Sequence, residues 1–451
     1  MPLASPDSME SGAPALAPLA QIVYIVYKEA PYFRSPSMST DAKAAAGSTP
    51  RRVRLSHRAE IAPASPIRKL EPFARRAAER GVKIYHLNIG QPDIPTPREF
   101  LRAARLDEGQ VLAYSPSGGL YPYRQALARY YAGFGAPVTE ADVLVTTGGS
   151  EALLFALMAL CDPGDEIITP EPHYPNYATF AIMAGATLRG LPTRIEDGFR
   201  LPGPEVFAAA VTERTRAILL CNPSNPTGTV YSRESLEAVV ALCRERGLIL
   251  IADEVYREFL YTADKPGSVL SLPGADEVTV VIDSVSKRFS ACGARIGCLV
   301  TKLPELMSAA TRFAMSRLSP PTLGQLGSIA ALEDPAPFIS SMIGEFCRRR
   351  DVLARGLKAL PGVLAPEPQG AFYLMTRLPV DSSERFCEWL LADFAHDNET
   401  VMLAPGPGFY QTPGAGTDEV RIAYVLAEEP LRRAVELLGH ALDRYPGTRR
   451  A

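Results

Sequence analysis

Short apolar runs alternate with longer amphipathic stretches along the chain from about residue 84 onward. The runs are apolar at consecutive positions, which is typical of strands buried on both faces of a parallel sheet. Helical stretches lie between them, and the one over 232–247 begins at a capping residue, Ser232, and ends at Gly247. This β-α-β alternation predicts a doubly wound α/β domain that binds its ligands at the carboxyl ends of the strands. The predicted strands are VLVTT (143–147), EIITP (166–170), AILLC (217–221), LILIAD (248–253) and VTVVIDS (278–284).

The first 55 residues have a different composition and are expected to form a disordered N-terminal extension. They are rich in Ala, Pro, Ser and Gly, a composition that buries too little apolar surface to order a chain. Their apolar segment QIVYIVY (21–27) is too short to span a bilayer, and Asp7 and Glu10 stand where a secretory signal carries basic residues. Met38 is an alternative to Met1 as the start of translation.

Length and composition favour a soluble globular protein of two domains. The chain has 451 residues, of which 47% are hydrophobic and 22% are charged. A net charge of −3 gives no electrostatic reason to expect a nucleic-acid partner. The seven cysteines are scattered without paired short spacings, which argues against a disulfide framework and against a zinc site. We therefore expect a cytoplasmic protein with no metal and no membrane or nucleic-acid partner.

Polar residues of particular kinds follow four of the predicted strands, where ligands are expected. Glycines after the first strand let the backbone turn closely, and the helix that follows favours an anion at its N-terminus. A plain turn is an equally natural reading there and at the segment NPSNPTG. A carboxylate that ends a buried strand needs a partner, because an unpaired buried charge is expensive. The residues are Gly148, Gly149 and Ser150 after 143–147, NPSNPTG after 217–221, Asp253 and Tyr256 at the end of 248–253, and Ser284, Ser286, Lys287 and Arg295 after 278–284.

Pyridoxal 5'-phosphate is the cofactor whose groups match this set of residues. Its aldehyde reacts with a lysine, its protonated ring nitrogen pairs with a carboxylate, and its phosphate binds a helix N-terminus, hydroxyls and an arginine. Its ring also needs an aromatic cover, which the segment EPHYPNY (171–177) offers. The four strand ends therefore predict a pyridoxal-phosphate site centred on Lys287.

Nine segments of the chain follow one another in the order LNIGQPD, YSPSGG, GGSEAL, EPHYPNY, NPSNPTG, ADEVY, SVSKRFSACGARIG, GAFYLM and VRIAYV. In this order they resemble motifs of the class I/II aminotransferase family of fold type I pyridoxal-phosphate enzymes, nearest to the bacterial aspartate aminotransferases. The resemblance runs from about Ala59 to Leu442 and implies an α/β fold: a large domain with a mostly parallel sheet wrapped by helices, plus a smaller α+β domain. The large cofactor-binding domain would comprise residues 96–325, and the small domain would combine 56–95 with 326–451.

The resemblance implies a role for each matching residue at the cofactor ring. Lys287 would bind the cofactor as a Schiff base and later move a proton, and both tasks require an amine with a lowered pKa. Asp253 would pair with the protonated ring nitrogen. Asn225 and Tyr256 would hydrogen-bond the phenolic oxygen of the ring. Tyr174 would stack on the ring face, although core packing is the alternative for such an aromatic residue.

The resemblance also places residues at the phosphate. Ser284 and Arg295 would bind it together with the backbone amides of Ser150 and Glu151, and Arg295 would supply a charge-assisted contact. Tyr114 would reach the phosphate of the neighbouring subunit. The resemblance therefore implies a homodimer with shared active sites.

Substrate recognition is implied for fewer residues. Arg421 would bind the substrate α-carboxylate, with Gly90 closing over it and Asn225 beside it. The resembling bacterial enzymes often carry a lysine directly after the two glycines, where this chain has Ser150. Arg317 is a candidate to bind a side-chain carboxylate instead, and a structural arginine is an equal alternative.

The resemblance implies a pyridoxal-phosphate-dependent aminotransferase that moves an amino group from an amino acid to a 2-oxo acid by a ping-pong cycle. Aspartate is one possible donor, and the acceptor and the pathway stay open. A lyase or decarboxylase is an alternative, because it would use the same residues. A non-catalytic regulator is least favoured, since the N-terminal extension lacks the basic helices and the length of a DNA-binding module.

Overall fold

The computed structural model describes residues 54–262 and 267–449. The predicted N-terminal extension, including Met38, lies outside the described residues except for residues 54 and 55. Within the described ranges, no helix is both long and apolar enough to cross a membrane.

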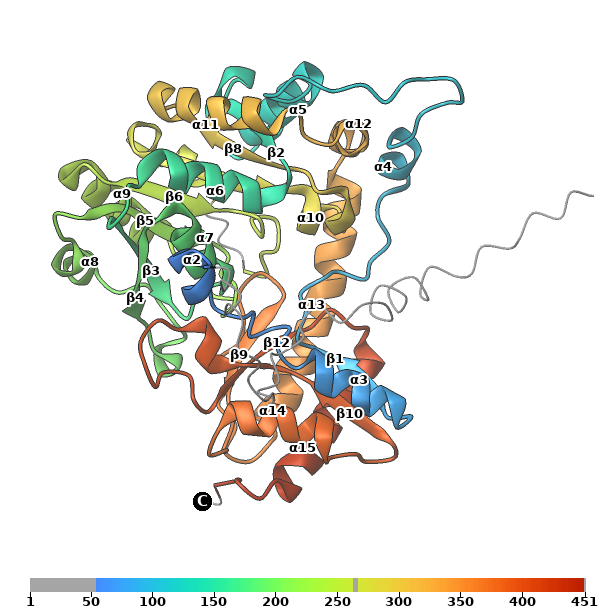
Figure 1. Ribbon diagram of the computed structural model, residues 1–451. Helices are drawn as coiled ribbons and strands as arrows, with labels where there is room; N and C mark the ends of the chain where they lie inside the picture. The colour runs from blue at the N-terminus through green and yellow to red at the C-terminus, as the bar shows by residue number, and fades with distance from the viewer. Residues whose placement is uncertain (1–53, 263–266, 450–451) are drawn as a thin grey trace, which may run out of the picture. The chain divides into compact units, whose positions relative to one another are not determined.

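A seven-stranded sheet organises the part of the fold that carries the predicted strand ends (Figure 1). Its strands are β2 (Val143–Thr146), β3 (Glu166–Glu171), β4 (Thr187–Pro192), β5 (Thr215–Cys221), β6 (Ile249–Asp253), β7 (Thr279–Ser284) and β8 (Gly297–Thr301). They run in the order β2-β8-β7-β6-β5-β3-β4. All neighbours are parallel except for β8, which is antiparallel to both β2 and β7. The predicted α/β fold with a mostly parallel sheet is confirmed.

Helices cover both faces of this sheet, which explains why its strands are apolar at consecutive positions. In β5, Leu219 belongs to one hydrophobic core, whereas its neighbours Ile218 and Leu220 belong to the other. The first core also contains the buried face of α6 (Gly148–Leu160), and the second contains that of α9 (Arg233–Arg246). The other helices are α2 (His57–Ile61), α3 (Glu71–Glu79), α4 (Arg98–Ala103), α5 (Tyr121–Ala132), α7 (Asn176–Ala184), α8 (Pro204–Ala210), α10 (Val285–Arg288), α11 (Pro304–Arg317), α12 (Thr322–Glu333), α13 (Ala336–Lys358), α14 (Ser383–Ala392) and α15 (Glu428–Arg444).

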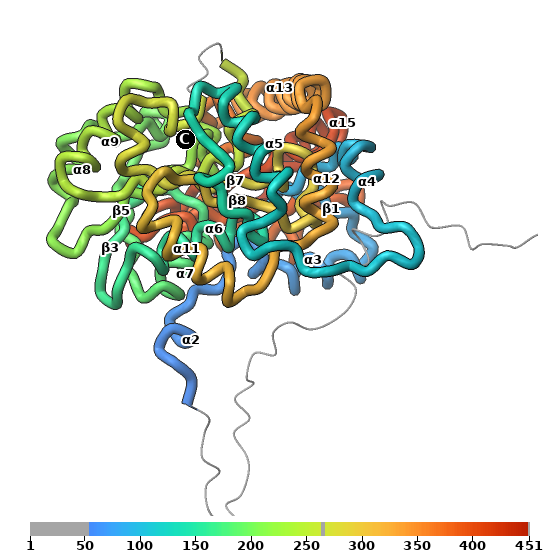
Figure 2. The backbone as a smooth tube through the Cα atoms, turned by 90° about the horizontal axis from the view of Figure 1, so that it is seen from above, coloured from blue at the N-terminus to red at the C-terminus, as the bar shows by residue number. Residues whose placement is uncertain are grey.

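The predicted residues begin and end helix α9. The Ser232 side chain accepts a hydrogen bond from the backbone N–H of Ser235 at 3.2 Å, and Gly247 adopts φ +64° after the last turn. Helix α12 lies beside α4 and α5, and Figure 2 shows α5 and α12 from above. These contacts join segments about 200 residues apart in the chain.

Two smaller sheets join the early and late parts of the chain. Strand β1 (Lys83–His86) pairs in parallel with β10 (Glu399–Met402), so residues more than 300 positions apart lie side by side. The second small sheet is antiparallel and has the order β11-β12-β9. Its strands are β9 (Tyr373–Arg377), β11 (Ala404–Pro405) and β12 (Glu419–Ala423).

The strand order brings the predicted strand ends to one edge of the large sheet. Strands β5, β6 and β7 are neighbours, and Cys221 at the end of β5 is in register with Asp253 at the end of β6. Ser284 at the end of β7 pairs with Gly297 of β8, which in turn pairs with Thr146 at the end of β2. The turn into α6 therefore lies at the same edge as the start of α10.

Candidate active site

A cavity of about 620 Å³ lies at this edge of the large sheet. Nearly all of the predicted site residues line it, although they come from segments far apart in the chain. The charged and polar lining residues are Ser65, Arg68, Gln91, Ser150, Tyr174, Asn176, Tyr177, Asn225, Asp253, Tyr256, Ser284, Ser286, Lys287, Arg295, Tyr373 and Arg421.

Lys287 stands in the first turn after β7, on the short helix α10. The hydroxyl of Ser284 caps this helix by accepting a hydrogen bond from the Ser286 N–H at 3.1 Å. The Lys287 Nζ donates to the carbonyl of Gly90 at 2.8 Å and lies 3.7 Å from the Cys292 Sγ. Burial lowers the pKa of Lys287; Cys292 raises it, and the charges of Arg421 and Arg295 lower it. The lowered pKa that the family resemblance requires is thus provided by the site.

Asp253 ends β6 as a buried carboxylate. Its Oδ2 accepts a hydrogen bond from the Tyr177 hydroxyl at 2.5 Å, and its Oδ1 accepts one from the Val255 N–H at 3.3 Å. No basic side chain among the described residues forms an ion pair with it. Burial raises the pKa of Asp253 to about 6, because the charged form lacks a compensating cation. This buried carboxylate therefore fits a protonated ring nitrogen, from which it would accept a hydrogen bond.

The turn from β2 into α6 is shaped for close approach. Gly148 adopts φ +76°, and a Cβ built on it would lie 2.3 Å from an Arg295 guanidinium nitrogen. A Cβ on Gly297 of β8 would lie 2.5 Å from the backbone of Gly148. Because neither glycine has a Cβ, the backbone of this turn, β8 and Arg295 can pack closely together. The N-terminus of α6, Ser284 and Arg295 then lie side by side at the cavity. A phosphate fits this set, because α6 contributes free N–H groups and Arg295 a positive charge.

Arg421 crosses the cavity from β12 of the small antiparallel sheet. It is 1% exposed, and no carboxylate of the described residues forms an ion pair with it. Its Nη1 donates to the Asn225 Oδ1 at 3.1 Å, its Nη2 donates to the Asn88 carbonyl, and its Nε has no partner within the described ranges. A buried cation with an unused N–H fits a carboxylate ligand.

Tyr373, in the strand GAFYLM, is a site residue that the sequence reasoning did not single out. Its hydroxyl lies 2.9 Å from that of Tyr256, and the Arg421 guanidinium lies 4.6 Å from the centre of its ring. A Cβ on Gly90 would lie 1.8 Å from the Tyr373 hydroxyl, so only glycine allows the two segments to meet. Cys292, whose Sγ lies 3.7 Å from the Lys287 Nζ, is a second lining residue that was not predicted. The position of Tyr373 within a recognised motif was the one signal available.

Three predicted residues do not line the cavity. The Glu151 side chain accepts a hydrogen bond from the Thr147 N–H at 2.7 Å and forms an ion pair with Arg317 at 3.3 Å. Arg317 also donates to the Ser117 carbonyl at 3.1 Å, which supports its structural alternative. Tyr114 is 81% exposed. The phosphate contact of the Glu151 amide and the roles of Tyr114 and Arg317 stay predictions.

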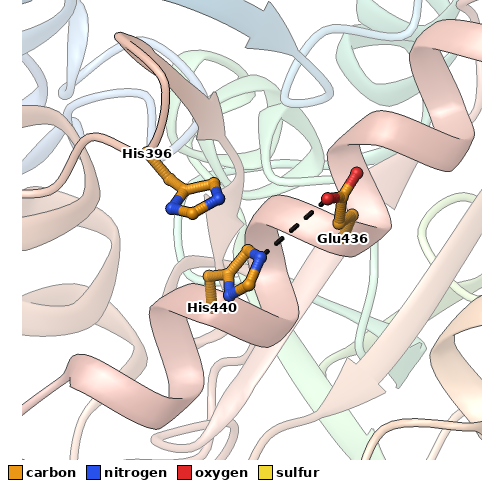
Figure 3. A group of neighbouring side chains, drawn as sticks. All are labelled: His396, Glu436 and His440. Carbon is orange, nitrogen blue, oxygen red and sulfur yellow. Dashed lines mark ion pairs between the residues drawn. The ribbon is translucent and has the colours of Figure 1, made fainter.

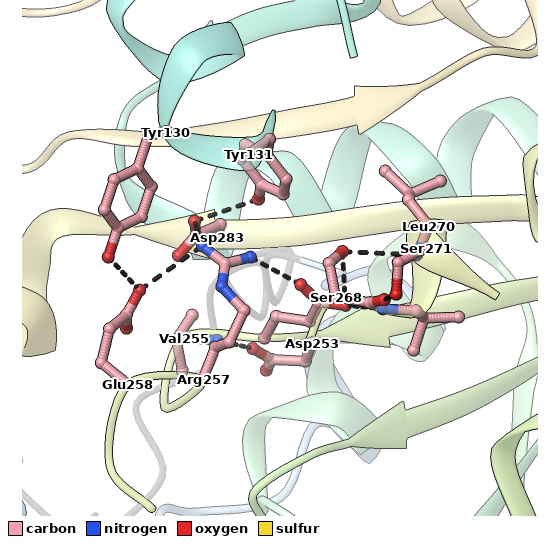
Figure 4. Close-up of polar contacts among 12 residues, drawn as sticks. Tyr130, Tyr131, Asp253, Val255, Arg257, Glu258, Ser268, Leu270, Ser271 and Asp283 are labelled. Carbon is pink, nitrogen blue, oxygen red and sulfur yellow. Dashed lines mark hydrogen bonds and ion pairs between the residues drawn. The ribbon is translucent and has the colours of Figure 1, made fainter. Parts of the chain in front are cut away.

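A buried ionic network lies directly behind the cavity lining. Asp283 stands between two arginines, with its Oδ2 3.0 Å from the Arg257 Nη2 and 2.5 Å from the Arg288 Nη2 (Figure 4 shows Arg257 and Asp283). Arg288 also donates to Glu258 at 2.8 Å, and Arg257 to Glu254 at 2.6 Å. The network residues alternate with lining residues: Asp253 precedes Glu254, Tyr256 precedes Arg257, Ser284 follows Asp283, and Lys287 precedes Arg288. The network therefore ties together the two turns that carry Asp253 and Lys287.

A second polar cluster consists of His396, Glu436 and His440 (Figure 3). None of the three lines the cavity. The possible ligand atoms of the cluster lie within 4.8 Å of one another. Arg433 already forms an ion pair with Glu436 at 2.9 Å, and Arg444 contacts the His396 Nδ1 at 3.1 Å. Two positive charges beside the cluster oppose a cation, so we assign no metal to it.

The mostly parallel sheet flanked by helices, with a cavity at its strand ends, defines an α/β protein of the kind that binds ligands at this edge of the sheet. Residues 82–438 match the family described as aminotransferase class I and II. The chain belongs to this family and is an aminotransferase, as its nine motifs predicted.

Known aminotransferases are similar to this chain over nearly their whole length. The aspartate/prephenate aminotransferase of Thermus thermophilus is 34% identical over 400 residues, which cover 86% of this chain and 99% of the relative. The aspartate aminotransferase of Pyrococcus horikoshii is 31% identical and covers 86% and 97%, respectively. The solved structure of Thermus thermophilus aspartate aminotransferase with maleate has 33% identity and a TM-score of 0.78, covering 86% of this chain and all of that one. Alanine aminotransferase from Pyrococcus furiosus has 30% identity and a TM-score of 0.80, covering 87% and 100%.

Proposed function

We propose that this aminotransferase uses pyridoxal 5'-phosphate held by Lys287 and transfers the amino group of an acidic amino acid to a 2-oxo acid. The observation that carries the proposal is the convergence of Lys287, Asp253, Arg295 and Arg421 on one cavity. When bound, pyridoxal phosphate supplies an electron sink that stabilises negative charge on the substrate Cα. The acidic substrate is supported by the relatives named for aspartate and by the maleate of the Thermus structure.

Different residues of the chain bind the cofactor ring, bind the substrate and move the proton. Asp253 pairs with the protonated ring nitrogen, and Asn225 and Tyr256 hydrogen-bond the ring oxygen, while Tyr174 covers the ring. Arg421 binds the substrate α-carboxylate, because it is a buried cation with an unused N–H. Lys287, whose pKa is lowered chiefly by burial, accepts the proton that leaves the substrate Cα.

The phosphate end combines side-chain and backbone donors. Ser284 and Arg295 bind the phosphate together with the amides of Ser150 and Glu151 at the N-terminus of α6. Gly90 contributes its carbonyl to Lys287 and, by lacking a side chain, leaves room for Tyr373 beside Arg421.

We further propose a cytoplasmic homodimer with shared sites and the division into a large domain (96–325) and a small domain (56–95 with 326–451). Tyr114 would contact the phosphate bound in the partner subunit. Its exposure, with Val111 84% and Leu112 57% exposed nearby, supports a surface that a second copy covers. Analytical ultracentrifugation tests the dimer, and Tyr114→Phe should weaken cofactor binding if the hydroxyl contacts the phosphate.

Replacing Lys287 tests the proposed function. Lys287→Ala should lose the visible absorbance of lysine-linked pyridoxal and nearly all amino transfer, because no other lysine of the described residues lines the cavity. The matched control is Lys358→Ala, which removes an exposed lysine at the end of α13 and should change neither property. Unchanged absorbance in Lys287→Ala would show that another lysine binds the cofactor. Steady release of ammonia by the wild type, without conversion of the cofactor to its amine form, would contradict transamination and favour a lyase.

A further inference from the structure

Arg68 is a lining residue of the cavity that the proposed function leaves without a role. It lies in the turn before α3, next to Ile67, which also lines the cavity. The backbone of this turn is held in place: the Arg68 N–H donates to the Ser65 carbonyl at 3.1 Å. The Arg68 residue itself is exposed. A fixed backbone with an exposed cationic side chain suits a residue that contacts a small ligand.

The turn that carries Arg68 is connected to the α-carboxylate end of the cavity. Asn88 donates from its side chain to the Ile67 carbonyl at 3.0 Å, and its own carbonyl accepts from Arg421. Arg68 and Arg421 both lower the pKa of the Tyr174 phenol, whereas burial, the largest cause, raises it. Both cations therefore act on the same aromatic residue of the cavity.

The charges that line the cavity are unbalanced. Among the described residues, the basic lining residues are Arg68, Lys287, Arg295 and Arg421, and the one acidic lining residue is Asp253. The proposed function assigns Lys287 to the cofactor, Arg295 to its phosphate and Arg421 to the α-carboxylate. Arg68 remains, and its guanidinium makes no hydrogen bond or ion pair with another residue in the described part of the chain. Arg317, the other candidate for a carboxylate contact, is already paired with Glu151 at 3.3 Å and lies outside the lining.

We propose that Arg68 is the specificity-determining residue that binds the side-chain carboxylate of a dicarboxylic substrate, while Arg421 binds its α-carboxylate. The inference rests on the proposed function and names the residue that selects acidic over neutral substrates. A carboxylate placed near Arg68 gains a charge-assisted hydrogen bond that a neutral side chain cannot make. Removing that contact lowers kcat/KM only for substrates that carry the second carboxylate.

The test compares Arg68→Met with wild type on aspartate and glutamate, and on alanine as a neutral donor. We expect kcat/KM for the acidic donors to fall about 10- to 100-fold, the range of one charge-assisted contact, and that for alanine to change less than about 3-fold. Arg68→Lys keeps the charge and should restore part of the loss. Arg75→Met is the matched control, because Arg75 is an exposed arginine on α3 that does not line the cavity.

Ligand binding gives a readout that does not depend on turnover. Maleate should raise the melting temperature of the cofactor-loaded wild type and of Arg75→Met, and should raise that of Arg68→Met clearly less. Equal losses on acidic and neutral donors would overturn the role of Arg68, and so would a selective loss in Arg317→Met but not in Arg68→Met. A wild type that transfers no amino group from any donor would instead overturn the proposed function.

Discussion

Replacing Arg288 by methionine should destabilise the protein strongly, although Arg288 itself does not line the cavity. The side chain is 1% exposed, and it donates to Glu258 at 2.8 Å and to Asp283 at 2.5 Å. Methionine keeps much of the apolar volume of arginine, but the buried carboxylates of Glu258 and Asp283 each lose one hydrogen-bond donor. Removing one partner of a buried ion pair costs about 3–5 kcal/mol. Asp283 keeps its contact with Arg257 at 3.0 Å, so we expect the lower end, about 3 kcal/mol.

Urea unfolding followed by circular dichroism measures this loss, with cofactor and protein concentrations held constant because both shift the apparent stability. Arg233→Met is the matched control, since the ion pair of Arg233 with Glu237 spans 2.9 Å between side chains that are 48% and 40% exposed. Loss of such a surface pair costs about 0.3–0.5 kcal/mol. If Arg288→Met unfolds within about 1 kcal/mol of the wild type, or together with the control, the network does not stabilise the fold as we infer.

Further predictions concern the lining itself. Burial raises the pKa of Asp253 to about 6, above its ordinary 3.8, so the folded cofactor-free protein loses stability as the pH rises from about 4 through 6. Asp253→Asn should therefore make the cofactor-free protein more stable at pH 7.5, by up to about 3 kcal/mol. The gain in stability should be smaller at pH 5. Thermal unfolding at pH 7.5 measures the difference, and a variant less stable than the wild type would contradict the prediction. Gly90→Ala places a Cβ 1.8 Å from the Tyr373 hydroxyl and should lower kcat/KM at least about 10-fold, which steady-state kinetics with any active donor will show. Gly297→Ala should cost about 1–3 kcal/mol by overpacking, whereas Gly293→Ala, which meets no atom within 4 Å, should leave the urea midpoint unchanged.

The apolar runs predicted the large sheet well, because strands buried on both faces must be apolar at consecutive positions. The run EIITP at 166–170 corresponds to β3 (Glu166–Glu171), and LILIAD ends at Asp253 as β6 does. Strand β8 was not predicted, although its residues GCLVT are buried. It begins shortly after Arg295, and its antiparallel direction departs from the β-α-β alternation that predicts parallel strands.

The sequence by itself determined where the strand-end residues would meet, because the carboxyl ends of neighbouring parallel strands lie at one edge of a sheet. Asp253, Ser284 and Lys287 follow from that rule, and the motif order identifies the family. Only the tertiary structure decided which distant side chains complete the cavity. Arg421 contacts the Asn88 carbonyl across 333 positions of sequence, and Glu151 pairs with Arg317 across more than 160. Such contacts depend on how separate sheets and helices pack, and a local sequence pattern does not predict that packing. The same packing places Arg68 in the lining of the cavity.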